Sequence, residues 1–447
     1  MWVLALATAG LLFDGYDLVV YGAVVSTFLR DTSQIGPVTP AVAGALGSYA
    51  LFGVTLGALM AGAVGDIIGR RKVILASYAW FSFGMAATAM SHSASTFGWM
   101  RFLTGLGIGA LAATTAALVY EYAPSGKKSL FVAISNGGIP LGSMLSALLA
   151  IVLMPHIGWR GMFWIGALPL ALLPLAYFKM PESVAWLVAR GRMDEARALA
   201  QRIGVPMPDA SHETAAAATE GSKTRAPAEV RSGFAGLFGS YYLWPTVLLG
   251  LMSAIGLLLV YSLNTWLPEL MLRAGFNTKG SLAFLAVLNG GSLFGAVAAS
   301  RAADRFGPKP VVAASFATGA LALVLLTARM PLGVLLAIVA IVGLGTSGTQ
   351  TMIYAFTAGY YRTQVRAAGV AWCAGFGRLG GIGGPLLGSL LISSGLALNA
   401  VFYILAAIAL AGATLTLLVP LSRSAHFLHA QPHQAGATPQ LNTQATP

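Results

Sequence analysis

Long apolar blocks dominate this chain and leave it few ways to fold. Twelve blocks of about 20 residues, each bounded by charges, Pro or Gly, lie near 2–28, 41–65, 73–91, 97–120, 129–154, 161–179, 241–266, 281–300, 310–328, 332–356, 364–392 and 397–420. One such block is long enough to cross the hydrocarbon core of a bilayer as a helix. Of the 447 residues, 57% are hydrophobic and 9% are charged, whereas a soluble domain carries about 25% charged residues. The sequence therefore predicts an all-α membrane protein with twelve transmembrane helices.

The distribution of the 26 Lys and Arg residues predicts which way the helices face. Loops on one side hold only Arg30, Arg160, Arg273, Lys279 and Arg329; Arg101 and Arg378 lie inside helices, and all the others fall on the opposite side. Loops rich in Lys and Arg stay in the cytoplasm. We therefore expect a multi-pass protein of the cytoplasmic (inner) membrane with both termini in the cytoplasm. The net charge of +12 then reflects topology, and we expect no nucleic-acid partner.

The apolar blocks are interrupted once, in the middle of the chain. We expect an N-terminal six-helix half at 1–179 and a C-terminal six-helix half at 241–422. Residues 180–240 begin with an amphipathic part from Trp186 to Arg202 and continue as a polar run, which predicts a partly disordered cytoplasmic linker. Residues 423–447 are predicted to be a disordered cytoplasmic tail, and its three His residues are not taken as a metal site. The first block serves as its own insertion signal, and we expect a short tail ahead of Met1.

A charged signature follows the second block and returns after the eighth. Asp66 stands three residues before Gly69, and Asp304 three residues before Gly307; the basic residues that follow include Arg70, Arg71 and Lys309, with Arg305 beside the second acid. A tight turn needs Gly at such a position, while the acid can cap the next helix or bond the N-terminus of a neighbouring helix. We expect Asp66, Arg70, Arg71, Asp304 and Arg305 to form a cytoplasmic gate. Recurrence in both halves is typical of the parallel repeat of one large class of transporters.

Two carboxylates, Asp14 and Asp17, interrupt the first apolar block. Each costs about 2.5–3.5 kcal/mol near the bilayer centre, so their presence indicates a use. At about 1.5 Å per residue, Asp14 lies roughly 18 Å along the first helix, near the midplane. The spacing places Asp14, Asp17 and Tyr21 on one helical face and leaves Gly15 and Gly22 for close packing.

Arg378 lies about fourteen residues into the eleventh block, also near mid-depth. Two acids and an arginine at one level predict a shared polar cavity, and the planar fork of an arginine suits a carboxylate ligand. All six His residues fall in loops or the tail, so a proton carrier must be a carboxylate, a coupled pair or the ligand itself. Two close carboxylates repel each other, and a proton on one relieves the repulsion. The alternatives are a buried structural pair of the acids with Arg378 or backbone donors, and a purely structural Arg378.

Three motifs give the chain a resemblance to the major facilitator superfamily over essentially its full length. They are Gly62-x3-Asp66-x2-Gly69-Arg70-Arg71-Lys72, with Ile67 where a basic residue is usual, Arg101-x3-Gly105-x3-Gly109, and Pro181-Glu182-Ser183-x2-Trp186-Leu187. Within the superfamily, residues 14–22, 264–268 and 369–382 are similar to the aromatic acid:proton symporters, which carry benzoate, hydroxybenzoates and related acids. The resemblance implies two pseudo-symmetric six-helix halves that carry a substrate by alternating access.

The resemblance also implies roles for individual residues. It implies a monomeric proton-coupled importer of a small aromatic carboxylate, with no enzymatic activity and no cofactor besides the proton gradient. Asp14, Asp17, Arg378, Arg101 and Glu121 are expected to serve substrate binding and proton coupling. Either aspartate can take the proton, and Asp17 is the favoured one. Arg101 serves either coupling or anchoring at the interface, and Glu121 is expected to latch the gate with Arg70, Arg71 or Arg366. The expected substrate pocket holds Tyr21, Asn264, Trp372 and Tyr354.

Two other functions remain open at this point. The first is a proton-coupled carrier of another organic acid, or an exporter of organic anions or drugs. The second, from a different class, is a membrane sensor that binds aromatic acids without transporting them.

Overall fold

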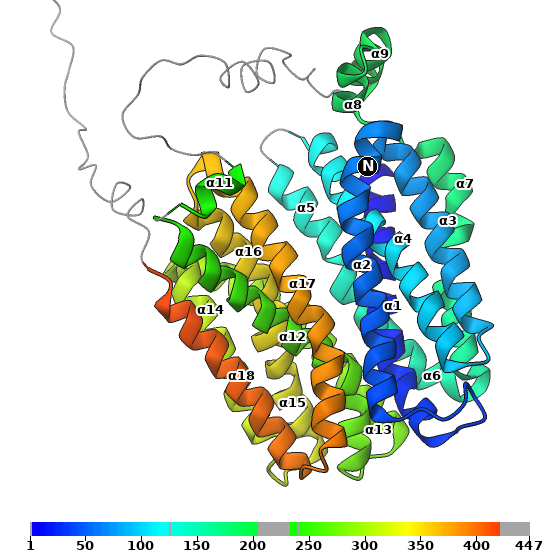
Figure 1. The fold of residues 1–447 in the computed structure, drawn as a ribbon, viewed down its shortest axis with the longest axis vertical. Coiled ribbons are helices and arrows are strands. Elements are labelled where there is room, and N and C mark those ends of the chain that lie inside the picture. Colours follow the sequence, from blue (N-terminus) through cyan, green and yellow to red (C-terminus); the bar gives the residue numbers. More distant parts are fainter. Residues whose placement is uncertain (1, 125–126, 204–232, 240, 421–447) are drawn as a thin grey trace, which may run out of the picture.

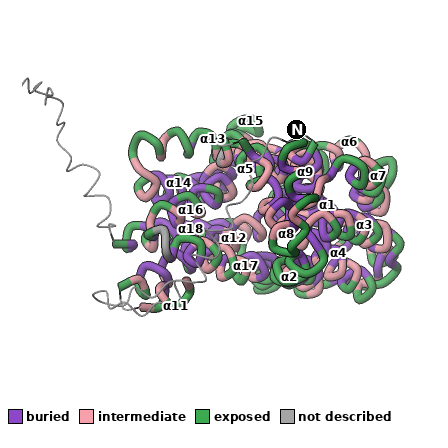
Figure 2. The backbone as a smooth tube through the Cα atoms, turned by 90° about the horizontal axis from the view of Figure 1, so that it is seen from above, coloured by how far each residue is buried: buried purple, intermediate pink, exposed green. Residues whose placement is uncertain are grey.

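The computed structural model describes residues 2–124, 127–203, 233–239 and 241–420 (Figure 1). The described residues form long helices that run side by side in one bundle. We call the end that carries α8 and α9 the upper end and the opposite end the lower end, as they stand in Figure 1. Two groups of helices, α1–α7 and α12–α18, stand next to each other, and Figure 2 shows both groups from above with α8 and α9 over the first.

The first half contains six spans built from seven helices. The fifth span consists of α5 and most of α6, and the sixth of the end of α6 and α7. The break within α6 falls at Gly158, whose φ of 64° interrupts the helix after Pro155. The helices are α1 (Trp2–Arg30), α2 (Pro40–Ile68), α3 (Arg70–Ala89), α4 (Ala94–Tyr122), α5 (Lys128–Asn136), α6 (Gly138–Gly166) and α7 (Pro169–Lys179), followed by the short α8 (Val184–Ala189) and α9 (Met193–Ile203).

The second half repeats this plan. A short α11 (Gly233–Leu237) precedes it, and its tenth span combines α15 and α16 with a π-helical turn, η1, between them. The helices are α12 (Leu243–Arg273), α13 (Thr278–Phe306), α14 (Pro308–Leu325), α15 (Leu332–Gly343), η1 (Leu344–Gly348), α16 (Thr349–Tyr360), α17 (Thr363–Ser393) and α18 (Leu398–Leu418).

Each predicted apolar block corresponds to a span within the described part of the chain. Nine stretches there are long and apolar enough to cross a membrane, and one of them, Leu130–Lys179, holds two spans. The remaining two spans are α3, which opens with Arg70, Arg71 and Lys72, and α17, which contains Arg378. The predicted amphipathic part is confirmed as α8 and α9. The predicted disordered linker and tail fall largely on 204–232 and 421–447, outside the described residues.

The two charged signatures form matching turns at the upper end. Gly69, between α2 and α3, has φ 100°, and Gly307, between α13 and α14, has φ 86°. Because side chains rarely adopt this conformation, the prediction that the turn needs glycine is confirmed at both places. The idea that the acids cap the next helices is wrong: the glycines themselves are the N-cap residues, and no side-chain hydrogen bond caps α3 or α14.

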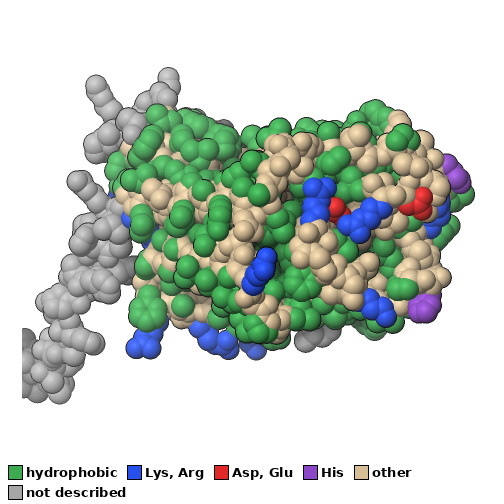
Figure 3. Space-filling model, turned by 90° about the horizontal axis from the view of Figure 1, so that it is seen from below, with side chains coloured by type: hydrophobic (Ala, Val, Ile, Leu, Met, Phe, Trp, Pro, Cys, Tyr) green, Lys and Arg blue, Asp and Glu red, His purple; other side chains and the backbone are tan. Residues whose placement is uncertain are grey.

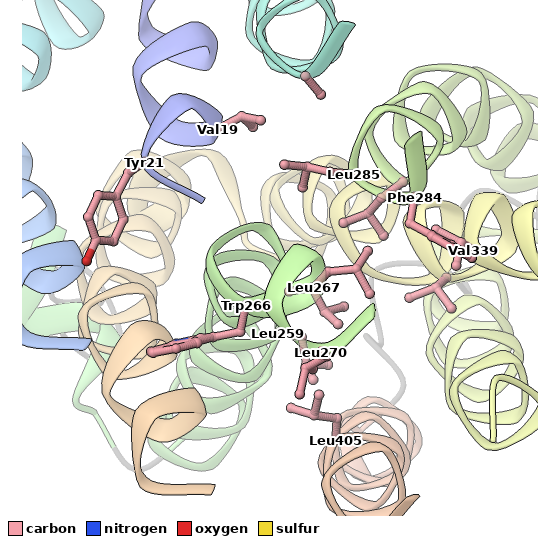
Figure 4. Packing of buried hydrophobic residues seen from close by; sticks show 14 of the residues in the cluster. Val19, Tyr21, Leu259, Trp266, Leu267, Leu270, Phe284, Leu285, Val339 and Leu405 are labelled. Atoms are coloured by element: carbon pink, nitrogen blue, oxygen red, sulfur yellow. The ribbon is translucent and has the colours of Figure 1, made fainter. Parts of the chain in front are cut away.

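The two halves meet in the lower part of the bundle. Among the described residues, two hydrogen bonds join them: Ser48 Oγ to the Ile382 carbonyl at 2.8 Å, and Arg30 to Glu269 at 3.4 Å. The backbone of α1 also approaches α12 here, since a Cβ at Gly22 would overlap the carbonyl oxygen of Asn264. Figure 4 shows the apolar core around this contact, with Tyr21 on α1 and Trp266 extending from α12. This layer seals the lower end of the molecule.

Candidate functional site

Asp17 and Arg101 form an ion pair inside the first half. Arg101 comes from α4, its side chain is 3% exposed, and its guanidinium lies over the rings of Tyr21 and Phe163 at 5.5 and 5.8 Å. Of the two roles left open for Arg101, anchoring at the membrane interface is therefore wrong, because the side chain turns inward to Asp17. The pair is closed off from solvent within one half of the protein.

Asp14 lies one turn above Asp17 and faces the other half. It is half-buried, and no hydrogen bond or ion pair to its carboxylate is found among the described residues. It lies within electrostatic range of Asp17 and of Arg378 on α17. A three-residue step rotates a helix position by about 60°, so the two carboxylates point toward different neighbours. The predicted cavity is thus divided: Asp14 faces Arg378, while Asp17 faces Arg101.

Arg378 is the basic group of the second half at this level. It is half-buried, and it lies within electrostatic range of Tyr261 from α12 and Tyr354 from α16. Glycines bring α17 close to α12, since a Cβ at Gly380 would overlap the carbonyl oxygen of Ala254. Polar groups from three helices of the second half therefore gather opposite Asp14.

The π-helical turn η1 precedes α16, the helix that carries Tyr354 of this cluster. Gln350 is the second residue after η1, and its Nε2 donates to Ser253 Oγ on α12 at 3.0 Å. Such turns change the rotational setting of the helix that follows and often occur at functional sites. Here the turn sets the directions of Gln350 and Tyr354, one helical turn apart.

Glycines fix the position of the helix that carries the acids. A Cβ at Gly15 would overlap the carbonyl oxygen of Ile139 on α6, and Ser143 Oγ donates to the Gly15 carbonyl at 3.0 Å. Gly22 makes the corresponding approach to α12. The prediction that these two glycines permit close packing is confirmed.

The residues expected to line the pocket lie in different places. Tyr354 is half-buried beside Arg378, as described above. Tyr21 is buried, its hydroxyl donates to the Ala43 carbonyl, and its ring lies beneath Arg101. Asn264 is buried and accepts a hydrogen bond from Asn289 at 2.9 Å, so it joins α12 to α13. Trp372 lies nearer the upper end, where its Nε1 donates to the Thr246 carbonyl at 3.0 Å. Tyr354 is thus the one of these four that lies beside the Asp14 and Arg378 level in this conformation.

The upper-end charges of the first half form a network. Arg70 pairs with Glu121, one of the three partners expected for this acid, and Ser183 Oγ donates to Glu121 at 2.6 Å. Glu182 accepts from the backbone N–H of Arg71 at 3.0 Å. These contacts hold the turn between α2 and α3 against the segment that follows α7.

The remaining expected gate residues take less part in that network. The backbone carbonyl of Asp66 accepts from Trp186 Nε1 at 3.0 Å, while its side chain is exposed. Asp304 and Arg305 are exposed, and the Arg305 guanidinium lies 5.2 Å from the centre of the Phe306 ring. Within the described residues, neither acid makes an ion pair.

Glu269, a buried carboxylate near the lower end of α12, was missed by the sequence analysis. Its side chain is 4% exposed and contacts Arg273 on its own helix at 2.9 Å and Arg30 on α1 at 3.4 Å. The signal resembled that of Asp14 and Asp17: an acid within an apolar helix, here a single one with an arginine four residues later.

Comparison with known proteins places the chain in a family. The model of the family described as "Sugar (and other) transporter" matches residues 2–420. The chain belongs to that family, within the major facilitator superfamily. It is 35% identical to the benzoate transport protein of Acinetobacter baylyi, over 88% of this chain and 83% of that protein. It is 34% identical to the gallate transporter of Pseudomonas putida, over 92% of this chain and 90% of that protein.

A solved structure shares the fold. The xylose transporter XylE from E. coli, in an inward-open conformation, matches with a TM-score of 0.74 at 17% identity, over 93% of this chain and 95% of that chain. The twelve-span fold in two pseudo-symmetric halves is therefore that of the major facilitator superfamily. The family and the relatives are transporters, so this chain is a transporter and not an enzyme.

Proposed function

We propose that this protein imports a small aromatic carboxylate, of the benzoate or hydroxybenzoate type, together with a proton. The observation that carries the proposal is the placement of Asp14 and Arg378. They lie on opposite halves, near mid-depth, half-buried and within electrostatic range of each other. Related proteins that match most of this chain are named for benzoate and gallate.

Arg378 is the proposed binding group for the substrate carboxylate. Its planar fork can donate to both carboxylate oxygens at once, which gives direction as well as strength. Tyr261 and Tyr354 lie nearby and offer aromatic surface and hydroxyl groups to a substrate ring. The sealed layer lies below Arg378, and Asp14 and Arg378 are only half-buried. Both observations support a binding site that a substrate reaches from the upper end in the present state.

Asp14, in place of Asp17, is the proposed proton carrier. Asp17 is held by Arg101 and closed off from solvent, whereas Asp14 has no partner within hydrogen-bonding distance among the described residues. Because the Arg101 guanidinium already compensates the charge of Asp17, Asp14 is the carboxylate at this level that is left to bind a proton.

A charge count supports one proton per carboxylate. The empty site holds Asp14, Asp17, Arg101 and Arg378, and their formal charges cancel. A bound carboxylate leaves a net charge of −1, and a proton on Asp14 restores neutrality. Because an uncompensated charge in a site closed from water costs several kcal/mol, occlusion and rocking of the halves require both ligands. Each pH unit is then worth about 1.4 kcal/mol, or roughly tenfold accumulation.

The distribution of Lys and Arg supports an orientation with the upper end in the cytoplasm. We place the protein in the cytoplasmic membrane, with both termini in the cytoplasm, acting as a monomer. Import then begins at the lower end, after the sealed layer opens, and ends in the state described above.

Transport by proteoliposomes tests the proposal. Radiolabelled benzoate and hydroxybenzoates should accumulate when the outside is made acidic, and a protonophore should abolish the accumulation. Since one proton with one carboxylate moves no net charge, a potassium diffusion potential alone should drive none. Uptake that survives the protonophore, or that follows the diffusion potential, would contradict the mechanism. Saturable binding without accumulation would point to a sensor instead.

A further inference from the structure

The lower end carries a charged cluster that the mechanism above does not use. Arg30 closes α1 in the first half, whereas Glu269 and Arg273 close α12 in the second. Arg30 contacts Glu269 across the two halves at 3.4 Å, and Figure 3 shows basic side chains next to an acidic one on the lower face. The cluster therefore stands where the two halves must separate for a substrate to enter.

The acid in this cluster is buried, whereas the two bases are exposed. The side chain of Glu269 is 4% exposed, while those of Arg30 and Arg273 are 52% and 43% exposed. The neighbouring acid, Asp31, accepts from the Ser33 hydroxyl and the Gln34 amide, each at 2.6 Å, and so is already hydrogen-bonded. A solute approaching from below thus meets two guanidinium groups with one carboxylate behind them.

A small cavity adjoins Arg30 between the halves. It has a volume of about 90 Å³ and is lined by Ser26 and Thr27 of α1 and by Thr278 and Ser281 of α13, among others. The hydroxyl oxygens of Ser26 and Ser281 are buried and find no hydrogen-bond partner in the described structure. Thr278 and Ser281 also belong to the first turn of a 29-residue helix, whose N-terminus favours anions.

The dimensions of the cavity agree with a closed entrance. A cavity of 150 Å³ is known to accept benzene, and each water takes about 30 Å³ of liquid volume. A space of about 90 Å³ is too small for an aromatic acid and suits a few waters. It becomes a binding site only when the halves move apart.

We propose that Arg30 and the first turn of α13 form an entry site for the carboxylate of the substrate. Glu269, itself a carboxylate, contacts Arg30 while the lower end is closed and is displaced when it opens. Arg273 keeps Glu269 on the second half during this change, because the two residues share a helix. Arg30 then moves with the first half and is free to bind the incoming anion. This inference rests on the proposed import of a carboxylate.

The entry site predicts KM changes of different direction for Arg30→Gln and Glu269→Gln. Arg30→Gln removes the binding group and should raise the KM for uptake from the lower side at least about tenfold, as expected for one charge-assisted hydrogen bond. Glu269→Gln removes the competing carboxylate and should leave KM equal or lower. If the contact between Arg30 and Glu269 only held the lower end closed, the result would differ. Both variants lose this contact, so both should open the lower end more easily and lower KM by a similar factor. KM does not depend on the amount of protein in the membrane.

Two further variants serve as controls. Arg329→Gln removes an equal charge from the lower end, at an exposed residue between α14 and α15 that makes no ion pair among the described residues, so its KM should stay within about twofold of wild type. Arg30→Lys keeps the charge without the fork and should fall between wild type and Arg30→Gln. Parallel KM shifts in Arg30→Gln and Glu269→Gln, or an equal shift in Arg329→Gln, would overturn the entry site. Absence of carboxylate uptake by the wild type would instead refute the proposed function.

Discussion

Replacing Asp17 by Asn leaves the Arg101 guanidinium without a counter-ion inside the first half. Breaking a buried ion pair in this way costs about 3–5 kcal/mol, because the remaining charge has no compensation. Arg101 keeps its contacts with the rings of Tyr21 and Phe163, each worth roughly 0.5–2 kcal/mol. Asp17→Asn should therefore cost about 3 kcal/mol of stability, at the lower end of that range. Arg101→Met, which leaves a buried carboxylate beside Asp14, should cost about 5 kcal/mol.

The double variant and Asp14→Asn complete the comparison. Asp17→Asn with Arg101→Met removes both charges, and replacing a buried pair by neutral groups is often close to neutral. It should recover most of the loss. Asp14→Asn removes a half-buried acid with no hydrogen-bonding partner among the described residues, and its lost repulsion from Asp17 offsets its lost attraction to Arg378. It should leave stability unchanged or slightly increased.

Thermal unfolding of the purified protein in one detergent measures these differences. Fluorescence-detected size-exclusion chromatography after heating should rank wild type and Asp14→Asn highest, then the double variant, Asp17→Asn and Arg101→Met. In transport, Asp14→Asn should keep counterflow and lose pH-driven accumulation. Equal thermal midpoints for Asp14→Asn and Asp17→Asn would refute the division of roles between the two acids.

Three further changes test other parts of the structure. Arg378→Lys should raise KM about tenfold through loss of the fork, whereas Arg378→Ala should abolish uptake; initial rates over a range of substrate concentrations measure both. Gly15→Ala should cost roughly 1–3 kcal/mol or prevent folding, while Gly62→Ala, where a Cβ meets open space, should leave folded yield unchanged or raised. Glu121→Gln and Arg70→Gln should each lower stability by about 1 kcal/mol or less, and the double variant no further, because they remove one partly exposed pair.

The spans and the packing glycines could be predicted from the sequence because each depends on local properties. Segment length and apolar content determine which segments cross a bilayer. The twelve predicted ranges agree with the helices to within about four residues, except that α12 and α13 extend about seven and six residues further. Gly69 and Gly307 lie in turns whose backbone favours glycine, and a spacing rule was enough to find them. Gly15 and Gly22 lie beside the acids on α1, where only a small residue allows the approach of α6 and α12.

The partners of the charged residues could not be predicted in the same way. Depth along a helix placed Arg378 level with Asp14 and Asp17, but depth does not determine which way each side chain points. The rotation of α1 turns Asp17 toward α4, where Arg101 reaches inward past Tyr21. Such a contact depends on the arrangement of three helices, and no pattern within one segment contains it.

The acid–arginine pairs of the described residues differ in how they respond to movement of the halves. Asp17 and Arg101 belong to one half, as do Glu121 and Arg70, so these pairs move as units and their charges cancel in every state. Asp14 and Arg378 belong to opposite halves, as do Glu269 and Arg30. At an effective dielectric constant of 20, the attraction between unit charges falls from about 4 kcal/mol at 4 Å to about 2 kcal/mol at 8 Å. Rocking of the halves therefore weakens the attraction within these two cross-half pairs by about 2 kcal/mol. The binding of a proton to the acid, or of a carboxylate to the arginine, can compensate a change of this size. In the proposed mechanism, Asp14 and Arg378 lie at mid-depth, where both sides of the membrane can be reached in turn, while Glu269 and Arg30 lie at the lower end, where we propose that the substrate first arrives.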